Sequence, residues 1–263
     1  RRFLQLRPFF IDAINRGNTT PNLGRLEATN PCGESPLYPN EACNLGSINI
    51  SRMVVNGKFD YELLGQVTAI ATRFLDDVID INCYPLPEIS EAVRRTRKIG
   101  LGLMGLADTL FQLDIAYDSK EAINFAGKVM KCIHDVATKT SEALGKEKGV
   151  PEDLAHLGRR NATLTCIAPT GTIALLADCS SGIEPVFSLE HTRVRTQLDG
   201  TKVAMKFQNK YYERAQKYMP DGTCGVISFG VKGGRAAAEK FMAGLKVAMI
   251  ATHVADAHTC VLH

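Results

Sequence analysis

No apolar run in the 263-residue sequence approaches the length that a membrane-spanning helix needs. The first residues, Arg1 to Arg7, contain too short an apolar stretch for a secretory signal peptide. The eight cysteines are scattered without a CxxC pair, and no group of histidines has the spacing of a metal site. We therefore expect a cytoplasmic protein with reduced thiols, with no membrane partner and no bound metal.

An excess of charge of one sign is also absent. The 31 lysines and arginines nearly balance the 28 aspartates and glutamates, and the two kinds are interspersed along the chain. The formal net charge of +3 does not favour a nucleic-acid partner, although a locally basic cleft for a phosphorylated substrate is compatible with it. A hydrophobic content of 45% is ordinary for a globular protein, and the length suits one large domain or two smaller ones.

Segments with the period of a strand alternate with segments that have the period of a helix. The apolar residues of 60–81 and 119–145 recur at helical spacing, and Asp118 with Glu121 has the pattern of a capping box. Residues 44–50 alternate between polar and apolar side chains, as a strand does. This alternation predicts the α/β class. The remaining expected elements are helices at 172–177, 211–218 and 236–252, and strands at 161–168, 226–231 and 259–262.

The segment Asn30-Pro31-Cys32-Gly33-Glu34 places three reactive side chains in a turn stiffened by proline. A thiol can exchange a hydrogen atom, a carboxylate can act as a base, and an amide can orient a hydroxyl group. A second thiol, Cys43, lies on the following strand, where it can supply reducing equivalents. The alternative is a buried structural cysteine in a proline-rich turn. The combination of Asn30, Cys32 and Glu34 favours a catalytic loop over this alternative.

A second candidate site is the segment Pro169-Thr170-Gly171-Thr172-Ile173, where an expected strand ends and a helix begins. The first N–H groups of a helix have no partner within it, so they can bind an anion such as a phosphate. The alternative is an ordinary turn between a strand and a helix, capped by a threonine side chain.

Two further patterns have structural interpretations. The segment 100–105 fits the dinucleotide-binding pattern GxGxxG, but the basic segment 94–98 precedes it where that fold needs an apolar strand. We therefore expect these glycines to serve close packing. Four other cysteines lie in apolar segments and are expected to be packing residues: Cys83, Cys132, Cys166 and Cys179.

Residues from about 10 to 219 resemble the catalytic core of an adenosylcobalamin-dependent ribonucleotide reductase. The matching segments are 28–34, 43–49, 74–80, 99–102, 160–163, 167–173 and 180–185. The resemblance implies a ten-stranded α/β barrel built from two five-stranded halves, of which this chain carries the second half with its finger loop. The cysteine loop and the Pro169 to Ile173 segment resemble the cobalamin-dependent class more than the class with a tyrosyl-radical subunit.

The same resemblance implies a role for each motif. Cys32 would become the thiyl radical that removes the 3′ hydrogen of the ribose, and Glu34 would take the proton of the 3′ hydroxyl group. Asn30 would bind the substrate hydroxyl groups, and Cys43 would be one of two cysteines that reduce the 2′ position. The implied cofactor is adenosylcobalamin, the substrate a ribonucleoside di- or triphosphate, and the reductant a thiol protein such as thioredoxin. The substrate phosphates would be held by Pro169, Thr170, Gly171, Thr172 and Ile173.

After Pro220-Asp221-Gly222 the sequence resembles part of the C-terminal domain of O-acetylhomoserine sulfhydrylase, a pyridoxal-phosphate enzyme. We therefore expect two domains, a partial reductase barrel at 1–222 and a strand–helix–strand tail at 223–263. Since the first half-barrel is not in this chain, we expect the enzyme to be incomplete. Two alternatives remain: an inactive chimeric fragment with at most an interaction role, and a fragment of a pyridoxal-phosphate sulfhydrylase.

Overall fold

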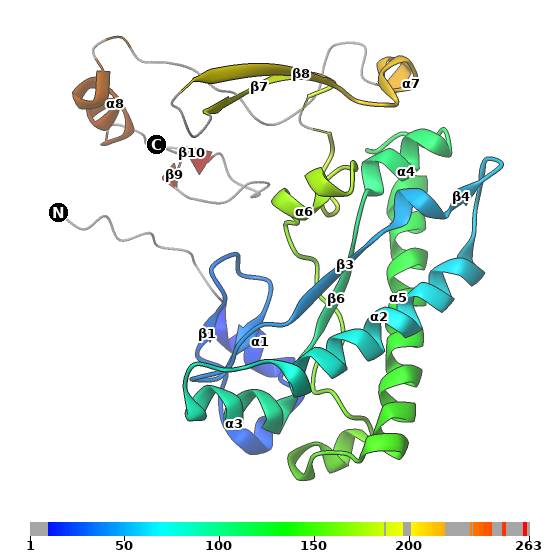
Figure 1. Cartoon of the computed structure of the whole chain (residues 1–263), viewed down its shortest axis with the longest axis vertical. Coiled ribbons are helices and arrows are strands. Elements are labelled where there is room, and N and C mark those ends of the chain that lie inside the picture. Colours follow the sequence, from blue (N-terminus) through cyan, green and yellow to red (C-terminus); the bar gives the residue numbers. More distant parts are fainter. Residues whose placement is uncertain are drawn as a thin grey trace. The chain divides into compact units, whose positions relative to one another are not determined.

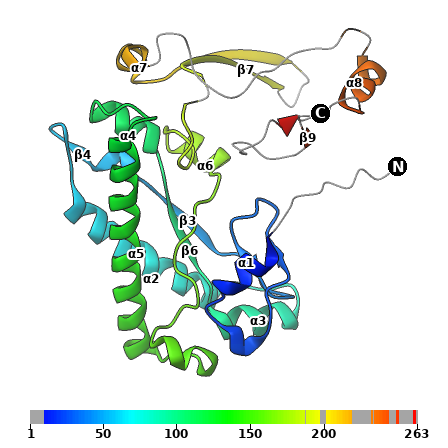
Figure 2. The same ribbon diagram turned by 180° about the vertical axis from the view of Figure 1, so that it is seen from behind.

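A computed structural model describes residues 10–186, 188–196, 201–218, 232, 234–243, 249–250 and 260–261 (Figures 1 and 2). The chain separates into two compact units, and each is described here by itself. The larger unit comprises residues 11–224, and the smaller unit comprises residues 1–10 with 225–263.

The larger unit contains both helices and strands, as the α/β class requires (Figure 1). Its described helices are α1 (Ile11–Arg16), α2 (Tyr61–Ile81), α3 (Pro87–Thr96), α4 (Leu106–Gln112), α5 (Lys120–Lys148), α6 (Gly171–Leu176) and α7 (Tyr212–Tyr218). Short 3-10 helices lie at Pro21–Leu23, Ile50–Met53 and Glu152–Leu157. Its described strands are β1 (Ala28–Thr29), β2 (Pro36–Leu37), β3 (Leu45–Asn49), β4 (Val54–Val55), β5 (Lys58–Phe59), β6 (Gly100–Met104), β7 (Glu190–Thr196) and β8 (Lys202–Gln208).

The strands β3 and β6 form a parallel pair. Leu45 lies opposite Gly100 and Asn49 opposite Met104, and the chain between the two strands crosses over through α2 and α3. Helices α2 and α5 pack against this pair (Figure 1). The core between the layers is formed by buried apolar side chains of both strands and both helices: Ile48, Leu64, Leu75, Ile79, Leu101, Leu103, Val129, Ile133 and Ala137.

Helix α2 confirms the helix expected over 60–81. Asp60 has an extended backbone just outside the helix, and its carboxylate accepts a hydrogen bond from the N–H of Leu63 at 2.9 Å. This is the usual way to satisfy an N–H group that has no partner within the helix. Prolines at positions 85 and 87 follow the last residue, Ile81, and they exclude a longer helix.

Helix α5 confirms the helix expected from residue 119 but has a different cap. Its N-cap is Ser119, whose hydroxyl oxygen accepts a hydrogen bond from the N–H of Ala122 at 3.0 Å. The predicted capping box led by Asp118 is therefore wrong by one position. Ser119 has φ −87° and ψ 155°, an extended backbone that places its side chain over the first N–H groups of the helix.

The regular strand expected at 161–168 is a wrong prediction. The segment makes an isolated bridge between Thr165 and Leu101 of β6. The carbonyl oxygen of Cys166 lies only 2.1 Å from where a Cβ atom on Gly102 would be. The segment lies beside β6 and shares backbone hydrogen bonds with it, such as that from the N–H of Leu101 to the carbonyl of Leu164 at 2.8 Å, but it does not form a regular ladder. The expectation that the glycines of 100–105 serve close packing is confirmed, since residues 100–104 form a buried strand.

In the smaller unit the described elements are α8 (Gly234–Ala243), β9 (Met249–Ile250) and β10 (Cys260–Val261), and the two strands are parallel. The helix expected over 236–252 is wrong at its C-terminal end, because Met249 and Ile250 belong to a strand. Glycine, a poor helix former, follows α8 at position 244. The strand expected at 226–231 lies outside the described residues, as does most of the segment that resembles the sulfhydrylase.

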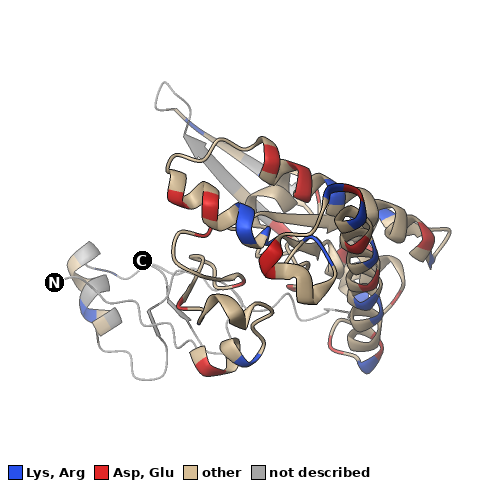
Figure 3. Cartoon of the chain, turned by 90° about the horizontal axis from the view of Figure 1, so that it is seen from below, with Lys and Arg blue, Asp and Glu red and all other residues tan. Residues whose placement is uncertain are grey.

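Acidic and basic residues are interspersed along the described elements, as the red and blue segments of the ribbon in Figure 3 show. This agrees with their distribution along the sequence. Among the described residues, no helix combines the length and the apolar character that a membrane span needs.

Candidate functional site

The cysteine loop is the turn of a β-hairpin. Strands β1 and β2 pair antiparallel, with Ala28 opposite Leu37 and Thr29 opposite Pro36, and residues 30–35 connect them. Cys32 lies within this turn and is exposed. The structure thus places Cys32 where the sequence predicts it, at the end of a loop.

Asn30 holds the turn in shape. Its side-chain oxygen accepts a hydrogen bond from the N–H of Ser35 at 2.9 Å, and its carbonyl oxygen accepts one from the N–H of Gly33 at 3.0 Å. Gly33 has φ 92°, a left-handed backbone that favours glycine. The residue types around Cys32 therefore serve a tight turn, and Asn30 is one of its supports.

Cys43 and Glu34 lie in the same neighbourhood as Cys32. The expectation that Cys43 lies on a strand is wrong, because β3 begins two residues later, at Leu45. Burial raises the pKa of the Cys43 thiol, and the charges of Glu34 and Cys32 raise this pKa further, against a hydrogen bond from the backbone that lowers it. The Oε2 atom of Glu34 is buried and has no hydrogen-bond partner among the described residues. At neutral pH Cys43 is a protonated thiol, which is the form that can donate a hydrogen atom.

Glu41 anchors the segment between the hairpin and β3, a role that the sequence did not indicate. Its carboxylate accepts hydrogen bonds from Lys98 Nζ and from Thr96 Oγ1, both at 2.6 Å. The side chains of Glu41 and Lys98 are only 2% and 6% exposed. Burial lowers the pKa of Lys98, and the charge of Glu41 opposes this shift. The pair ties the chain just before Cys43 to the start of β6.

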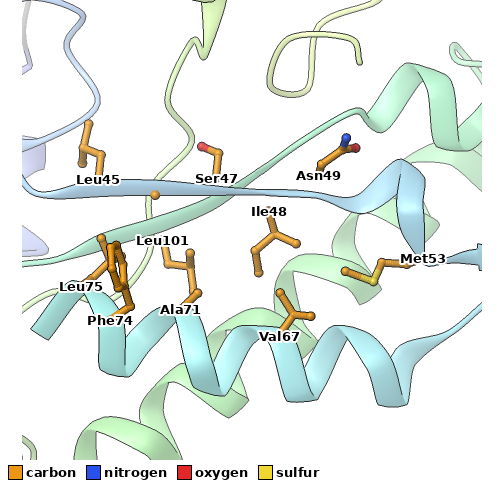
Figure 4. A pocket seen from close by; sticks show the side chains of 11 residues that line it. Leu45, Ser47, Ile48, Asn49, Met53, Val67, Ala71, Phe74, Leu75 and Leu101 are labelled. Atoms are coloured by element: carbon orange, nitrogen blue, oxygen red, sulfur yellow. The ribbon is translucent and has the colours of Figure 1, made fainter. Parts of the chain in front are cut away.

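The second candidate site lies beside β3. Figure 4 shows that Ser47 projects from one face of β3, whereas Ile48 points toward α2 on the other face. A cavity of about 210 Å³ lies between β3 and the turn at 168–173, and Cys32 is not among its lining residues. The lining residues are Leu45, Gly46, Ser47, Ala168, Thr170, Gly171, Thr172 and Ile173.

A different cavity, of about 430 Å³, lies between β3 and α2 (Figure 4). Its lining includes Val67, Ala71 and Phe74 of α2 together with Ile48 of β3, and its polar lining residues are Ser47 and Asn49. Among these lining residues there is no helix N-terminus with unpaired N–H groups. The smaller cavity at the 168–173 turn is therefore the better candidate for a phosphorylated ligand.

The turn before α6 is not capped by a threonine side chain. Thr170 has φ 52°, and its hydroxyl oxygen accepts a hydrogen bond from the N–H of Gly182 at 2.7 Å. The carbonyl oxygen of Thr170 accepts the first hydrogen bond of the helix, from the N–H of Ala174 at 2.9 Å. This arrangement favours the anion site over the alternative of a threonine-capped turn. The N–H groups left without a partner among the described residues are those of Gly171, Thr172 and Ile173.

Asp108 supports this turn from α4. One of its carboxylate oxygens accepts a hydrogen bond from the N–H of Ser180 at 2.7 Å, and the other accepts one from Asn209 Nδ2 at 3.3 Å. Burial raises the pKa of Asp108, although these hydrogen bonds lower it in part. Asp108 therefore holds the segment 180–182 in place. Within this segment, the N–H of Gly182 donates the hydrogen bond to Thr170.

Two other segments that match the reductases build a buried ion-pair network. Asp76 is fully buried and accepts hydrogen bonds from Arg97 Nε at 2.9 Å, Arg160 Nε at 2.8 Å and Asn161 Nδ2 at 2.9 Å. Asp80 accepts a further hydrogen bond from Arg97 at 2.7 Å. Although the carboxylates of Asp76, Asp77 and Asp80 lie close together, Arg97 and Arg160 already pair with Asp76 and Asp80, and Lys148 pairs with Asp77. The network has a structural role.

Two of the cysteines expected to be packing residues have other surroundings. Cys83 is exposed, because it lies just beyond the end of α2. Cys166 is half-buried, and burial raises its pKa to about 12, with contributions from the charges of Glu34 and Cys43. Cys166 therefore lies within electrostatic reach of Glu34 and Cys43, which no local sequence pattern indicated.

Known proteins of similar sequence are ribonucleotide reductases. The chain is 52% identical over 190 residues to the vitamin B12-dependent ribonucleoside-diphosphate reductase of Mycobacterium tuberculosis (strain CDC 1551 / Oshkosh), which covers 70% of this chain and 28% of that protein. The protein of the same name from Thermoplasma acidophilum is 51% identical over 192 residues, or 70% of this chain and 25% of that protein. The chain thus spans less than a third of the length of these two relatives.

A solved structure and a family model agree with these relatives. The alpha subunit of the class Id ribonucleotide reductase of Actinobacillus ureae has a TM-score of 0.63 and 26% sequence identity, over 81% of this chain and 39% of that one. The model of the ribonucleotide reductase barrel domain matches residues 7–154 and 150–219. Since this model matches most of the chain, the chain belongs to the ribonucleotide reductase family and carries part of its barrel domain.

Proposed function

We propose that the larger unit carries the radical loop and the phosphate site of an adenosylcobalamin-dependent ribonucleotide reductase. The proposed substrate is a ribonucleoside diphosphate, the class that appears in the names of both relatives. The observation that carries the proposal is the exposed thiol of Cys32 in a hairpin turn, in the neighbourhood of Glu34 and Cys43. A thiol, a base and a second thiol are the groups that this reaction needs.

In the proposed reaction, the sulfur radical of Cys32 takes the 3′ hydrogen atom of the ribose. Glu34 accepts the proton of the 3′ hydroxyl group, Asn30 orients the substrate hydroxyl groups, and the 2′ hydroxyl group leaves as water. Two thiols, of which Cys43 is one, give up two electrons and two protons and close to a disulfide. Cys32 then returns its hydrogen atom to the 3′ carbon.

Adenosylcobalamin supplies the first radical when it is bound. The exposed sulfur of Cys32 fits this requirement, because a bulky cofactor can approach a thiol in a hairpin turn. Cys32 is the residue that we assign to face the cofactor. Asn30 and Gly33 contribute by keeping the turn rigid.

The phosphates of the substrate are assigned to the cavity between β3 and the turn at 168–173. The unpaired N–H groups of Gly171, Thr172 and Ile173 are hydrogen-bond donors, and a phosphate offers several acceptor oxygens. After each reaction a thiol protein such as thioredoxin would reduce the disulfide again, as the reducing cytoplasm allows.

Nuclear magnetic resonance of the isotope-labelled chain tests the phosphate site. Titration with cytidine diphosphate should give saturable shifts of the amide signals of Gly171 to Ile173 and of Ser47. Cytidine without phosphates should leave these signals unchanged. The Cys32→Ser variant should bind cytidine diphosphate as well as the unchanged chain, because Cys32 does not line this cavity. Equal shifts with cytidine, or shifts confined to other segments, would contradict the assignment.

A further inference from the structure

The basic segment 94–98 ends in two neighbouring cations that are both buried but have different partners. Arg97 belongs to the ion-pair network around Asp76, whereas Lys98 lies two residues before β6 and is only 5% exposed. A lysine is almost never buried to this degree unless its ammonium group is paired. The groups around the Nζ atom of Lys98 therefore indicate what this residue does.

The partners of Lys98 come from the chain that follows Cys32. Its Nζ atom donates hydrogen bonds to the carbonyl oxygen of Pro36 at 3.3 Å and to the carboxylate of Glu41 at 2.6 Å. It also lies 4.4 Å from the centre of the Tyr38 ring, which is a cation–π contact. Pro36 belongs to β2, the second strand of the hairpin that carries Cys32. One ammonium group therefore contacts both this strand and the segment that follows it.

Residues 38–44, between β2 and β3, have little backbone structure of their own. Within them the described backbone–backbone hydrogen bond runs from the N–H of Glu41 to the carbonyl of Tyr38, at 3.2 Å. The carboxylate of Glu41 supplies further contacts, because it accepts hydrogen bonds from the N–H of Tyr38 at 2.7 Å and from Thr96 Oγ1 at 2.6 Å. Side-chain contacts to the buried charge pair therefore determine where this segment lies.

Tyr38 is also held by contacts that do not involve Lys98. Its hydroxyl group donates a hydrogen bond to the carbonyl of Thr20 at 2.7 Å and accepts one from Asn18 Nδ2 at 2.8 Å. These bonds tie the Tyr38 ring to the N-terminal part of the larger unit. We therefore expect that replacement of Lys98 leaves this part folded.

We propose that Lys98 is a positioning residue for the two thiols of the proposed reaction, Cys32 and Cys43. It acts through the carbonyl of Pro36 and the carboxylate of Glu41, and it sets the hairpin and the segment before β3 against the same end of β6. The hairpin needs this support, because β1 and β2 contain only two residues each.

The assignment deepens the proposed function and rests on it for its chemical meaning. The two thiols would act on the 3′ and the 2′ carbon of one ribose, so the distance between them has to be fixed. A reacting group that is misplaced by about 1 Å can lose roughly 100-fold in rate. The positions of the hairpin and of Cys43 can be measured without a nucleotide or a cofactor.

Two variants separate positioning from stability. Lys98→Met leaves the carboxylate of Glu41 buried without its counter-charge, which destabilises a folded chain. The double variant Glu41→Gln with Lys98→Met leaves no unpaired charge, and the glutamine oxygen can still accept hydrogen bonds from Tyr38 and Thr96. The double variant should therefore keep the melting temperature close to that of the unchanged chain, although Pro36 loses its contact with the ammonium group.

Hydrogen exchange followed by nuclear magnetic resonance measures the position of the hairpin. In the unchanged chain the N–H of Asn30 donates to the carbonyl of Ser35 at 3.2 Å, and the N–H of Ser35 donates to Asn30 Oδ1 at 2.9 Å. In the double variant both amides should exchange about 10-fold faster or more, because local opening no longer breaks a hydrogen bond to a charged group. The amide of Leu101 in β6 should keep its rate. The matched control Lys148→Met, at a lysine paired with Asp77, should leave the hairpin amides unchanged.

The pH dependence of alkylation at Cys43 gives a second measurement. Burial raises the pKa of this thiol, and the charges of Glu34 and Cys32 raise it further. Release of the segment reduces the burial, so the midpoint of the alkylation rate should move to lower pH in the double variant. This variant removes one charge of each sign, so the direct effects of the two lost charges on the thiol oppose each other. Peptide mass spectrometry distinguishes Cys43 from the other cysteines.

The outcomes separate this proposal from the proposed function. Unchanged hairpin exchange together with an unchanged midpoint at Cys43 overturns the positioning role. Faster exchange of Leu101 and the hairpin amides by the same factor also overturns it, because Lys98 then supports only general stability. Cytidine diphosphate should bind the double variant and the unchanged chain equally, since neither Lys98 nor Glu41 lines the phosphate cavity. If the unchanged chain fails to bind this nucleotide while the hairpin responds as expected, the positioning role stands and the proposed function is contradicted.

Discussion

Asp76 is the residue on which three segments of the larger unit converge. It receives hydrogen bonds from Arg97, Arg160 and Asn161, and both arginine side chains are almost fully buried with it. Asp76→Asn leaves these guanidinium groups without their main counter-charge. We expect a loss of about 3 to 5 kcal/mol in the free energy of unfolding, measured by urea denaturation. The control Asp77→Asn, at a half-exposed carboxylate paired with Lys148, should cost at most about 1 kcal/mol.

The same network makes the stability depend on pH. Burial alone would raise the pKa of Asp76, but the hydrogen bonds from Arg97, Arg160 and Asn161 outweigh it and lower the pKa. A lowered pKa in the folded state means that the stabilisation is complete above the ordinary aspartate pKa and is lost as the pH falls through the folded value. The free energy of unfolding should therefore fall below about pH 4. Asp76→Asn should flatten this fall, and an unchanged slope would show that Asp76 does not cause it.

At the scale of the element, the two neighbouring polar residues before α5, Asp118 and Ser119, have different roles, because only Ser119 caps the helix. Ser119 accepts the hydrogen bond from the N–H of Ala122, and its hydroxyl also donates to the carbonyl of Ala116 at 2.6 Å. Ser119→Ala should lower the melting temperature, with a loss of about 0.5 to 2 kcal/mol. Asp118→Ala should change stability by less than Ser119→Ala does. A larger loss of stability in Asp118→Ala than in Ser119→Ala would show that Asp118 is the cap.

The contact between β6 and the segment at 161–168 depends on glycine. A Cβ atom on Gly102 would lie 2.1 Å from the carbonyl oxygen of Cys166, and backbone cannot move aside as a flexible side chain can. Gly102→Ala should therefore destabilise the chain by about 1 to 3 kcal/mol or more. The matched control is Gly127→Ala in α5, where no atom lies within 4 Å of the added Cβ. That change should stabilise the chain by about 0.5 to 1 kcal/mol, because alanine favours the helix. Equal effects on the two melting temperatures would contradict the close contact.

At the scale of the whole molecule, we propose that residues 1–222 and 223–263 are separate domains, the second of them related to the sulfhydrylase. The described core of β3, β6, α2 and α5 lies entirely in the larger unit. A chain that stops at Cys224 should therefore keep the melting temperature and the urea midpoint of the full chain. A cooperative loss of structure on truncation would show that 225–263 is part of the same folding unit.

We expect no turnover from this chain by itself. Cys32 is exposed, and a sulfur radical in contact with water would be quenched before it met a ribose. The purified chain, supplied with adenosylcobalamin, a dithiol and cytidine diphosphate, should form no more deoxycytidine diphosphate than the Cys32→Ser variant, as chromatography of the products can measure. Product formation that depends on Cys32 would show that the chain shields the radical by itself.

The sequence by itself determined the elements whose pattern is local. The apolar periods of α2 and α5, the proline-stiffened turn around Cys32 and the turn at Pro169 to Ile173 all depend on residues within a few positions of one another. Such features follow from backbone preferences and side-chain spacing, which act over one or two turns. The motifs that match the ribonucleotide reductases are local strings of the same kind, and their order along the chain was sufficient to predict the family.

Only the tertiary structure decided which distant segments meet. Asp76 joins Arg160, Glu41 joins Lys98, and the sulfur of Cys166 lies at Gly100 close to Leu45 of β3, in each case across a long stretch of chain. The segment at 161–168 has the composition of a strand, yet it forms only an isolated bridge and irregular hydrogen bonds with β6, whose glycines let its backbone come close. Contacts of this kind depend on how packed elements cross and on where a glycine leaves space for another segment. No pattern within a single segment carries that information.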